Sequence, residues 1–441
     1  MSRLVRPILA AIAGALLAGS AGAQLLPGVA LPLPLPPVTN VPVVGPVVQN
    51  VLGQPQAQQA IRPTLDTVAG LPESVAEAGA PTLLELRRLR LRELIRDNRT
   101  FLEADDRGQP VRRGVLVALD PDPLSLQLAV GAGFRVIGSI SDPNLGLRGV
   151  QLAVPRGMAA RKALRLIEKT APGLQADFDH VYEPAGGALM PLNAALAAVA
   201  GRPNGRAIGM IDGGVASHPS LAGARIEQNG FAGSPKPTGH GTAVASLLVG
   251  TQGPFHGAAT GAQLYVADVY GGSRAAGSAT AIVKALGWLA SHRPQVINIS
   301  LVGPSNKLVQ RAIQIVESRG IQIVAAVGND GPAAPPQYPA SYPGVLAITA
   351  VDAHGRALPE AGKATHLDFA APGADMAAAL PGQGYARVRG TSFAAPLAAA
   401  RLLIAGSPAR LAAEARPGKG RVGRGIVCGE CRIDPNAVRA K

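Results

Sequence analysis

Five apolar segments in the second half of the chain constrain its fold more than any other feature. They are AIGMI (207–211), QLYVADVY (263–270), VINISL (296–301), IQIVAAV (321–327) and VLAITAV (345–351). Stretches with helical patterns separate them, and an alanine-rich run follows Ser392. Near-continuous apolar strands that alternate with helices indicate a parallel sheet covered on both faces. We therefore predict a three-layer α/β domain with a mostly parallel sheet, whose ligands bind at the carboxyl ends of the strands.

The length and charge of the chain limit the number of folded units and the classes of partner. A chain of 441 residues is too long for one ordinary core and favours two or three folded units. Much of the net charge of +14 lies in an arginine-rich stretch from Arg87 to Arg99 and in a basic tail from Arg410 onward. No nucleic-acid recognition motif accompanies either cluster, and aromatic residues make up only 3% of the chain. We predict no nucleic-acid partner.

The amino terminus has the pattern of a secretory signal peptide. Arg3 and Arg6 precede a short apolar run, and small residues at 21–23 suit a signal-peptidase cut, so residues 1–23 are predicted to direct export. Residues 24–81 carry a proline every few positions and are predicted to be an extended linker, with partner docking as the lesser alternative. No later segment offers about 20 uninterrupted apolar residues. We expect a periplasmic or extracellular protein without a stable transmembrane anchor.

A basic amphipathic helix is predicted over residues 82–104. Thr82 and Glu85 are spaced as a capping box, and leucines recur through the following turns. Its arginines could contact an anionic membrane surface. Packing of the leucines against a neighbouring domain, with the basic face in solvent, is the favoured alternative.

Residues 111–185 are predicted to form a separate unit. The patterns indicate, in order, a strand at 111–119, a helix at 123–133, strands at 134–140 and 148–155, a helix at 159–171 and a strand at 175–184. This order is the split βαβ plan. We expect a small α+β, ferredoxin-like domain.

The carboxyl-terminal region contains the only two cysteines, Cys428 and Cys431. In an oxidising compartment, a disulfide that closes a small loop is the favoured interpretation. Half of a metal site and a redox pair stay open as alternatives, although a lone CxxC supports neither strongly. Residues 435–441 are predicted to be a tail.

Three residues of chemical interest stand at predicted strand or helix ends. Asp212 follows the strand 207–211, and His240 and Ser392 each stand at the start of a helix. A helix amino terminus leaves backbone N–H groups unpaired, so a serine there lies beside donors for a developing oxyanion. A serine nucleophile also needs a base, and the base needs a carboxylate. Taken singly, each residue is better explained as a turn or cap residue.

Seven sequence blocks surround these residues. They are IGMIDGGVASHPSL, GHGTAVASLLVG, VINISLVG, AAVGNDG, YPASYPGVLAITAVD, LDFAAPG and GTSFAAP. In that order they resemble the characteristic blocks of the subtilisin-like serine protease family, and the chain order Asp, His, Ser is also that of the family. The resemblance extends from about Gly205 to Val427. It implies a subtilisin-like catalytic domain over residues 186–434.

The resemblance implies a role for each site residue. Asp212 would orient the base, His240 would be the general base and acid, and Ser392 would be the nucleophile. Asn329, in VGND, would correspond to the oxyanion-hole asparagine of the family, acting beside the backbone N–H of Ser392. Without the family context, Asn329 would be assigned to a turn.

Two segments would line the groove in which a substrate peptide lies as an added strand. They are Ser300, Leu301, Val302 and Gly303, and Ala325, Ala326, Val327 and Gly328. Their small and aliphatic side chains predict a preference for an apolar residue before the scissile bond.

Two positions depart from the pattern of the family. Gly213 stands where Thr or Ser is usual, and Ala243 stands where a second histidine is frequent. Neither position performs the chemistry, so activity is still expected. No compact cluster of acidic ligands specifies a calcium site, so no cofactor is predicted, and structural calcium is left as an alternative.

The family also gives a meaning to the unit at 111–185. Subtilisin-like proteases are commonly made with a βαβ-βαβ propeptide whose last strand occupies the groove, and FDHVYEP (178–184) resembles that ending. We predict self-processing between Tyr182 and Met190, with this unit as an intramolecular inhibitor. A permanent regulatory domain is the alternative, because the split βαβ plan has many uses.

The sequence as a whole predicts an exported serine endopeptidase that acts on protein or peptide substrates through an acyl-enzyme. The alternative is an inactive, peptide-binding relative, against which the retention of all four catalytic positions argues. A lipase or esterase would have GxSxG and the order Ser, Asp, His, whereas Ser392 lies in GTSFA.

Overall fold

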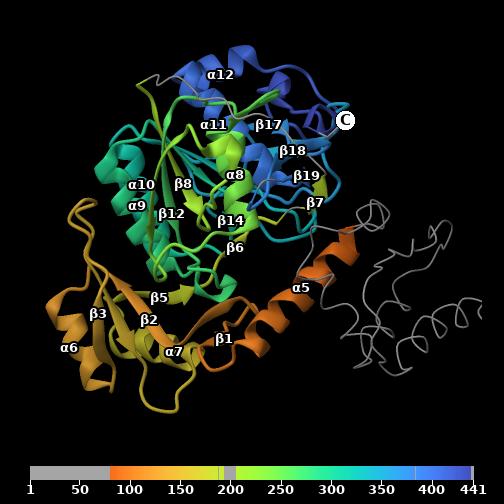
Figure 1. Cartoon of the computed structure of the whole chain (residues 1–441). Coiled ribbons are helices and arrows are strands. Elements are labelled where there is room, and N and C mark those ends of the chain that lie inside the picture. Colours follow the sequence, from red (N-terminus) through yellow and green to blue (C-terminus); the bar gives the residue numbers. More distant parts are fainter. Residues whose placement is uncertain (1–79, 187, 193–204, 383, 439–441) are drawn as a thin grey trace, which may run out of the picture. The chain divides into compact units, whose positions relative to one another are not determined.

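The computed structural model describes residues 80–186, 188–192, 205–382 and 384–438 (Figure 1). The predicted signal peptide (1–23) and almost all of the proline-rich segment (24–81) lie outside the described residues.

A seven-stranded sheet forms the centre of the larger part of the chain, and every strand pair in it is parallel. Its strands are, in sheet order, β17 (Phe369–Pro372), β16 (Leu346–Val351), β15 (Gln322–Ala326), β13 (Val296–Ile299), β8 (Ala207–Asp212), β12 (Gln263–Asp268) and β9 (Arg225–Gly230). The five apolar segments form the five inner strands. The edge strands β9 and β17 were not predicted, because β9 is polar and mostly exposed and β17 is short and ends in proline.

Helices cover both faces of this sheet (Figure 1). One face packs against α8 (Gly239–Val249) and α11 (Thr391–Ala405), and the other against α9 (Ala279–His292) and α10 (Lys307–Ser318). Successive strand residues alternate between the two cores: in β15, Val324 belongs to the first core and Ile323 to the second. This period of two is the geometry of a strand buried on both faces. The three-layer α/β fold is as predicted.

The remaining short elements of this part surround the central sheet. They are β10 (Thr251–Gln252) with β11 (Phe255–His256), β14 (Leu301–Val302), β18 (Met376–Ala379) with β19 (Tyr385–Arg389), the 3₁₀ turns η2 (Pro219–Leu221), η3 (Arg274–Ala276), η4 (Gly429–Cys431) and η5 (Pro435–Val438), and α12 (Pro408–Glu414). The segment expected to be a tail packs in part: Val438, at the end of η5, is buried against Phe255 and Tyr385.

A smaller unit precedes the region of the seven-stranded sheet. Its elements are β1 (Leu102–Ala104), β2 (Pro110–Leu119), α6 (Pro123–Gly131), β3 (Arg135–Ser139), β4 (Gly149–Ala153), α7 (Ala160–Thr170) and β5 (Gln175–His180). The antiparallel order β3-β4-β2-β5, with β1 beside the start of β2, is that of a split βαβ unit. Leu116 and Leu152 pack under α7, whereas Val117 and Leu119, on the opposite face of β2, join the core formed by α9 and α10.

Helix α5 (Ala80–Asp97) differs from its prediction at both ends. It begins two residues before Thr82, so Thr82 is not the N-cap of the helix. It ends at Asp97 rather than at 104, because the chain turns at 98–101 and then pairs as β1 with β2. Leu83 and Leu91 are buried, which supports packing rather than contact with a membrane. In the described part of the chain, no single helix is long and apolar enough to cross a bilayer, whereas the pair α11–α12 passes that test only with a bend of 108°.

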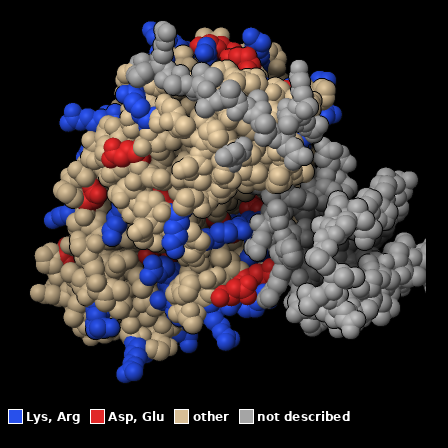
Figure 2. All heavy atoms as spheres, in the orientation of Figure 1, with Lys and Arg blue, Asp and Glu red and all other residues tan. Residues whose placement is uncertain are grey.

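Lys and Arg side chains are scattered over the face displayed in Figure 2 rather than gathered in one patch. Acidic side chains are fewer on this face and lie among them. On this face, the charges do not form the single basic stripe that is typical of a nucleic-acid surface.

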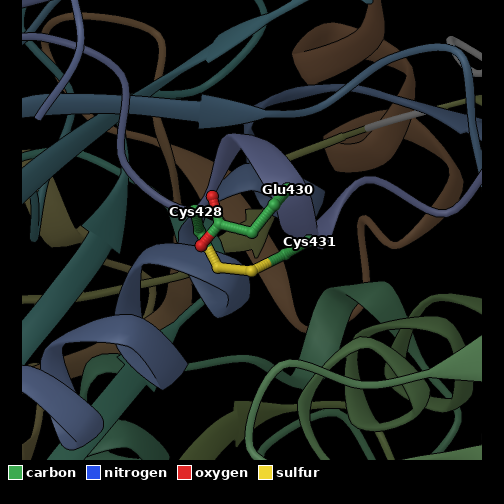
Figure 3. A group of neighbouring side chains, drawn as sticks. All are labelled: Cys428, Glu430 and Cys431. Atoms are coloured by element: carbon green, nitrogen blue, oxygen red, sulfur yellow. A yellow bond between two sulfur atoms is a disulfide. The ribbon is translucent and has the colours of Figure 1, made fainter. Parts of the chain in front are cut away.

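Cys428 and Cys431 form a disulfide, with their Cα atoms 5.2 Å apart. In the described ranges, these two cysteines and Glu430 are also the only cluster of three or more His, Cys, Asp or Glu side chains close enough together to bind one metal ion (Figure 3). Because the two sulfur atoms are bonded to each other, neither is a free thiolate for a metal ion. The predicted disulfide between the two cysteines is therefore confirmed.

The disulfide should stabilise the folded chain modestly, because it closes a loop of only a few residues. In a Ser392→Ala background, replacing both cysteines by serine should lower the free energy of unfolding by about 2 kcal/mol. Thermal melting of the two proteins, each with and without reductant, measures this difference. Equal melting temperatures under oxidising conditions would show that the bond contributes nothing.

Candidate active site

Asp212 is the last residue of β8, the strand that lies between β12 and β13 in the sheet. Of the strands that follow β8 in the chain, β12 lies beside it on one side and β13 on the other. Ligand crevices of open α/β sheets form at such a change in strand order. Its buried carboxylate accepts hydrogen bonds from the backbone N–H of Gly213 (2.7 Å) and from Nδ1 of His240, which lies 2.9 Å from each carboxylate oxygen. The contact fixes the orientation of the imidazole ring and directs Nε2 away from Asp212.

His240 is held at the start of α8 by two close contacts. Thr238 caps the helix, since its Oγ1 accepts a hydrogen bond from the N–H of Gly241 (2.9 Å). A Cβ on Gly241 would lie 2.3 Å from the carbonyl oxygen of Gly213, so only glycine allows α8 to begin so close to the end of β8. The same crowding explains one departure from the family pattern, because a Cβ on Gly213 would lie 2.5 Å from Oγ1 of Thr238.

Ser392 is the second residue of α11 and is fully buried. Its backbone carbonyl accepts a hydrogen bond from the hydroxyl of Ser300 (3.0 Å). The ring of the next residue, Phe393, lies 5.4 Å from the ring of His240. The start of α11 is therefore beside the imidazole, and its first backbone N–H groups face no earlier helical turn.

The hydroxyl of Ser392 donates to the carbonyl oxygen of Gly186 at 2.6 Å. No hydrogen bond joins Ser392 to His240 among the described residues, and the buried Nε2 of His240 has no hydrogen-bond partner there. The serine is thus engaged with a backbone carbonyl of the same chain, and the imidazole nitrogen that faces away from Asp212 is left without a proton donor.

Asn329 lies just after β15 and points its amide at the same carbonyl. Its Oδ1 accepts a hydrogen bond from the N–H of Thr391 (3.0 Å), which fixes the side chain. Its Nδ2 donates to the carbonyl oxygens of Gly186 (2.6 Å) and Ala185 (2.7 Å). The amide of Asn329 therefore holds the carbonyl oxygens of two successive residues, and the oxygen of Gly186 also accepts from the hydroxyl of Ser392.

The chain before Gly186 runs along one of the two predicted groove segments. Strand β6 (Glu183–Pro184) pairs antiparallel with β14 (Leu301–Val302), and the N–H of Ala185 donates to the carbonyl of Ser300 (2.9 Å). The second predicted segment, 325–328, makes no backbone hydrogen bond to residues 183–186 in the described structure. The backbone of Gly328 bonds instead to Gly362 and to the hydroxyl of Thr391.

The chain after Gly187 is held on the opposite side of the site. Strand β7 (Ala188–Leu192) pairs antiparallel with β19, with Leu189 opposite Val388. Leu189 also lies against Gly239, the residue before His240. Sequence reasoning gave no sign of β7 or of the role of Gly186, because a Gly-Gly pair between short apolar residues has no pattern of its own.

A buried cluster of charges flanks β6. Asp330 accepts from Nε of Arg87 and Nη2 of Arg90, each at 2.9 Å, and Glu183 lies 3.3 Å from Nε of Arg90 and 3.3 Å from Nη2 of Arg274. Burial by itself would lower the pKa of Arg90, but Asp330 and Glu183 outweigh it and raise the pKa above its ordinary value. Sequence reasoning missed these pairs, since it treated the arginines of α5 as a solvated face.

A model of the subtilase family matches residues 204–409. The chain is 33% identical over 198 residues to Subtilisin Savinase of Lederbergia lenta, a match that covers 44% of this chain and 73% of that protein. It is 33% identical over 221 residues to Subtilisin DY of Bacillus licheniformis, covering 47% of this chain and 80% of that protein. The chain belongs to the subtilase family of serine endopeptidases.

Two further relatives mark the limits of the likeness. An alkaline protease of Alkalihalobacillus alcalophilus is 33% identical over 198 residues, and the match covers 44% of this chain and 52% of that protein, so the chain spans about half of its length. Fervidolysin of Fervidobacterium pennivorans, described as a keratinolytic enzyme related to subtilisin, matches with a TM-score of 0.62 at 19% identity, covering 75% of this chain and 62% of that one. This structural likeness confirms the predicted subtilase fold.

Loss of the Asn329 amide should slow the reaction rather than weaken substrate binding. Removing one oxyanion donor in a subtilisin-type site costs roughly 100- to 1000-fold in kcat. We expect a loss of this size for Asn329→Ala, with KM changed by less than about threefold. Steady-state kinetics on a peptide substrate measures the split.

The side chain of Asn329 also holds the N–H of Thr391, so melting temperatures must accompany the kinetics. A folded Asn329→Ala protein whose kcat is unchanged, or whose loss lies wholly in KM, would contradict an oxyanion role.

Proposed function

We propose that this subtilase is an exported serine endopeptidase that is made as a self-processed zymogen and hydrolyses peptide bonds through an acyl-enzyme. One observation carries the proposal. The carbonyl oxygen of Gly186 lies 2.6 Å from the hydroxyl of Ser392 and 2.6 Å from the amide nitrogen of Asn329. These two hydrogen bonds hold a backbone carbonyl of the same chain within reach of the nucleophile and of the amide that would stabilise its oxyanion.

In the proposed reaction, Oγ of Ser392 attacks the carbonyl carbon of Gly186 while Nε2 of His240 takes its proton. For this step the hydroxyl turns from the oxygen of Gly186 toward the imidazole, whose Nδ1 is held by Asp212 at 2.9 Å. The negative charge that develops on the oxygen of Gly186 is stabilised by the Asn329 amide and by the backbone N–H of Ser392.

Collapse of the tetrahedral intermediate breaks the C–N bond between Gly186 and Gly187. His240 returns its proton to the amine of Gly187, and an ester joins Ser392 to Gly186. A water molecule, deprotonated by His240, then hydrolyses the ester to a carboxylate and restores the serine. The same steps apply to any peptide that replaces residues 183–186 in the groove.

The bond after Gly186 lies within the interval 182–190 expected from the sequence. Both sides of it are anchored, since β6 pairs with β14 before the bond and β7 pairs with β19 after it. Anchoring on both sides holds the carbonyl group in place at little entropic cost, because the two strands already belong to folded sheets. This supports Gly186–Gly187 as the processing bond.

We further propose that residues 80–186 remain docked after cleavage and inhibit the enzyme. Two carboxylates of β5 reach helix amino termini in the catalytic region: Asp179 accepts from the N–H of Thr280 (3.0 Å) and Asp177 from the N–H of Lys307 (2.9 Å). Carboxylates are favourable at this end of a helix. Together with the apolar contacts of Val117 and Leu119, they support a pro-segment that binds independently of the scissile bond.

Helix α5 adds a second attachment close to the oxyanion-hole residue. Arg87 and Arg90 bind Asp330, the residue after Asn329, and Leu83 packs against Gly331. Because these ion pairs are buried, removing the arginines leaves Asp330 charged and without its two partners in α5. The helix therefore belongs to the proposed inhibitor rather than to a linker.

Export rests on the amino-terminal sequence, with the Cys428–Cys431 disulfide as support, since disulfides persist in oxidising compartments. An inactive peptide-binding relative is the alternative function. It would leave Ser392 unlabelled by an organophosphonate serine probe after the pro-segment has left.

Processing should be autocatalytic and confined to one bond. The purified full-length chain should yield a product that begins at Gly187, whereas the Ser392→Ala variant should stay uncut, because no other described group replaces the hydroxyl at Gly186. Intact-mass and amino-terminal mass spectrometry detect both outcomes.

A product that begins elsewhere would reject the assigned bond but keep autocatalysis. Cleavage of Ser392→Ala that persists in the absence of other proteases would reject autocatalysis itself.

The arginines of α5 should control how long the cut pro-segment stays bound. Arg87→Gln with Arg90→Gln should leave the rate of cleavage within about twofold, but should shorten the lag between cleavage and hydrolysis of an added peptide by roughly tenfold or more. Gel analysis follows cleavage, and a chromogenic peptide follows activity in the same sample.

Arg88→Gln is the matched control, since Arg88 lies on the same helix but is exposed. An unchanged lag in the double variant, or the same shortening in the control, would show that Arg87 and Arg90 do not hold the cut pro-segment in place.

A further inference from the structure

Glu183 occupies a defined place in the groove. It lies on the amino-terminal side of the proposed cut and pairs with Val302 of β14. Its side chain is 6% exposed, which is unusual for a carboxylate unless it is paired. Each of its oxygens lies 3.3 Å from an arginine, Oε2 from Arg90 and Oε1 from Arg274.

The two arginines lie on opposite sides of the proposed cut. Arg90 belongs to α5 and would leave with the pro-segment, whereas Arg274 belongs to η3 in the catalytic region and would stay. After maturation, Arg274 is therefore the arginine of this pair that meets a new peptide in the groove.

Arg274 is held in register with the peptide by the backbone that follows it. The carbonyl of Gly277 accepts from the N–H of Tyr182 (2.7 Å), and Ser278 forms a β-bridge with Val181. The peptide and the segment that carries Arg274 are thus aligned by hydrogen bonds that do not depend on the peptide's side chains. Alignment of this kind lets one side chain recognise one substrate position.

Asp330 is an opposing charge close to this contact. Among the described residues it is linked to Glu183 through Arg90, whose Nε contacts Glu183 and whose Nη2 contacts Asp330. A carboxylate at the position of Glu183 would therefore touch Arg274 directly, while Asp330 would lie beyond the place that Arg90 vacates. Coulomb energy falls with distance and with screening by water, so the direct contact outweighs the more distant one.

We propose that Arg274 determines specificity in the mature enzyme by selecting substrates with an acidic side chain at the position that pairs with Val302 of β14. The inference rests on the proposed endopeptidase function and names its substrate class: peptides with Glu or Asp at this position and small residues, as at Ala185 and Gly186, beside Asn329. Arg274 acts on binding and orientation, and it does not touch the reacting atoms.

The test uses the matured enzyme and three peptides that follow residues 183–189 of the chain. They are acetyl-Glu-Pro-Ala-Gly-Gly-Ala-Leu and the same peptide with Gln or Lys in place of Glu. For the wild type we expect kcat/KM to fall in the order Glu, Gln, Lys, with Glu favoured over Gln about fivefold or more. The side chain of Arg274 is 40% exposed, which keeps the effect moderate, and the preference should shrink at high ionic strength.

Two variants separate recognition from general damage. Arg274→Gln should bring the Glu-to-Gln ratio close to one, and Arg274→Glu should reverse the order so that Lys is favoured. Arg319→Gln removes the same charge from an exposed residue after α10 and should keep the wild-type ratio. Asp330→Asn should increase the preference for Glu, because it removes the opposing charge.

The outcomes distinguish the two levels of the proposal. If no peptide is cleaved and the serine probe does not label Ser392, the proposed function fails. If all three peptides are cleaved at equal rates, or if Arg274→Glu keeps the wild-type order, the enzyme is active and the assignment of Arg274 is wrong.

Discussion

The hydrogen bonds to the carbonyl oxygen of Gly186 are the contacts on which the rest of the site depends. One donor comes from the start of α11 and the other from the loop after β15, so the carbonyl is held only if both elements are in place. Asn329 also binds Thr391 of α11, which ties the two elements to each other. Alignment of the nucleophile with the oxyanion donor is therefore a property of the folded sheet and its helices rather than of a flexible loop.

Much of the fold could be predicted because it follows local rules. Each inner strand is apolar along its whole length, since both of its faces are covered, and each site residue stands at a strand or helix end, where short-range turn and cap signals occur. The same rules did not predict the edge strand β9, because its residues are mostly polar and exposed to solvent. They also failed at the end of α5, where pairing of β1 with β2 ends the helix seven residues earlier than the leucine pattern suggested.

The long-range contacts of the site could not be predicted. Arg87 and Asp330 are 243 positions apart, and nothing near either residue in the sequence indicates the other. An arginine on a predicted helix is usually solvated, so the buried ion pair appears only when the helix is placed against the catalytic region. The groove shows the same limit, because both predicted segments have suitable small residues. In the described structure, residues 300–302 form backbone contacts with residues 183–185, whereas Gly303 pairs with Tyr338 and the backbone of Gly328 is bonded elsewhere.

The carboxylates of Asp177 and Asp179 have a consequence for the life of the mature protein. They bind the first turns of α10 and α9, and neither helix has an acidic residue in its own first turn. If the chain is cut after Gly186, both groups leave with the separated fragment. The lifetime of the remaining folded protein then depends on the height of its unfolding barrier. A mature chain that unfolds must form the amino termini of α9 and α10 again without the carboxylates of Asp179 and Asp177.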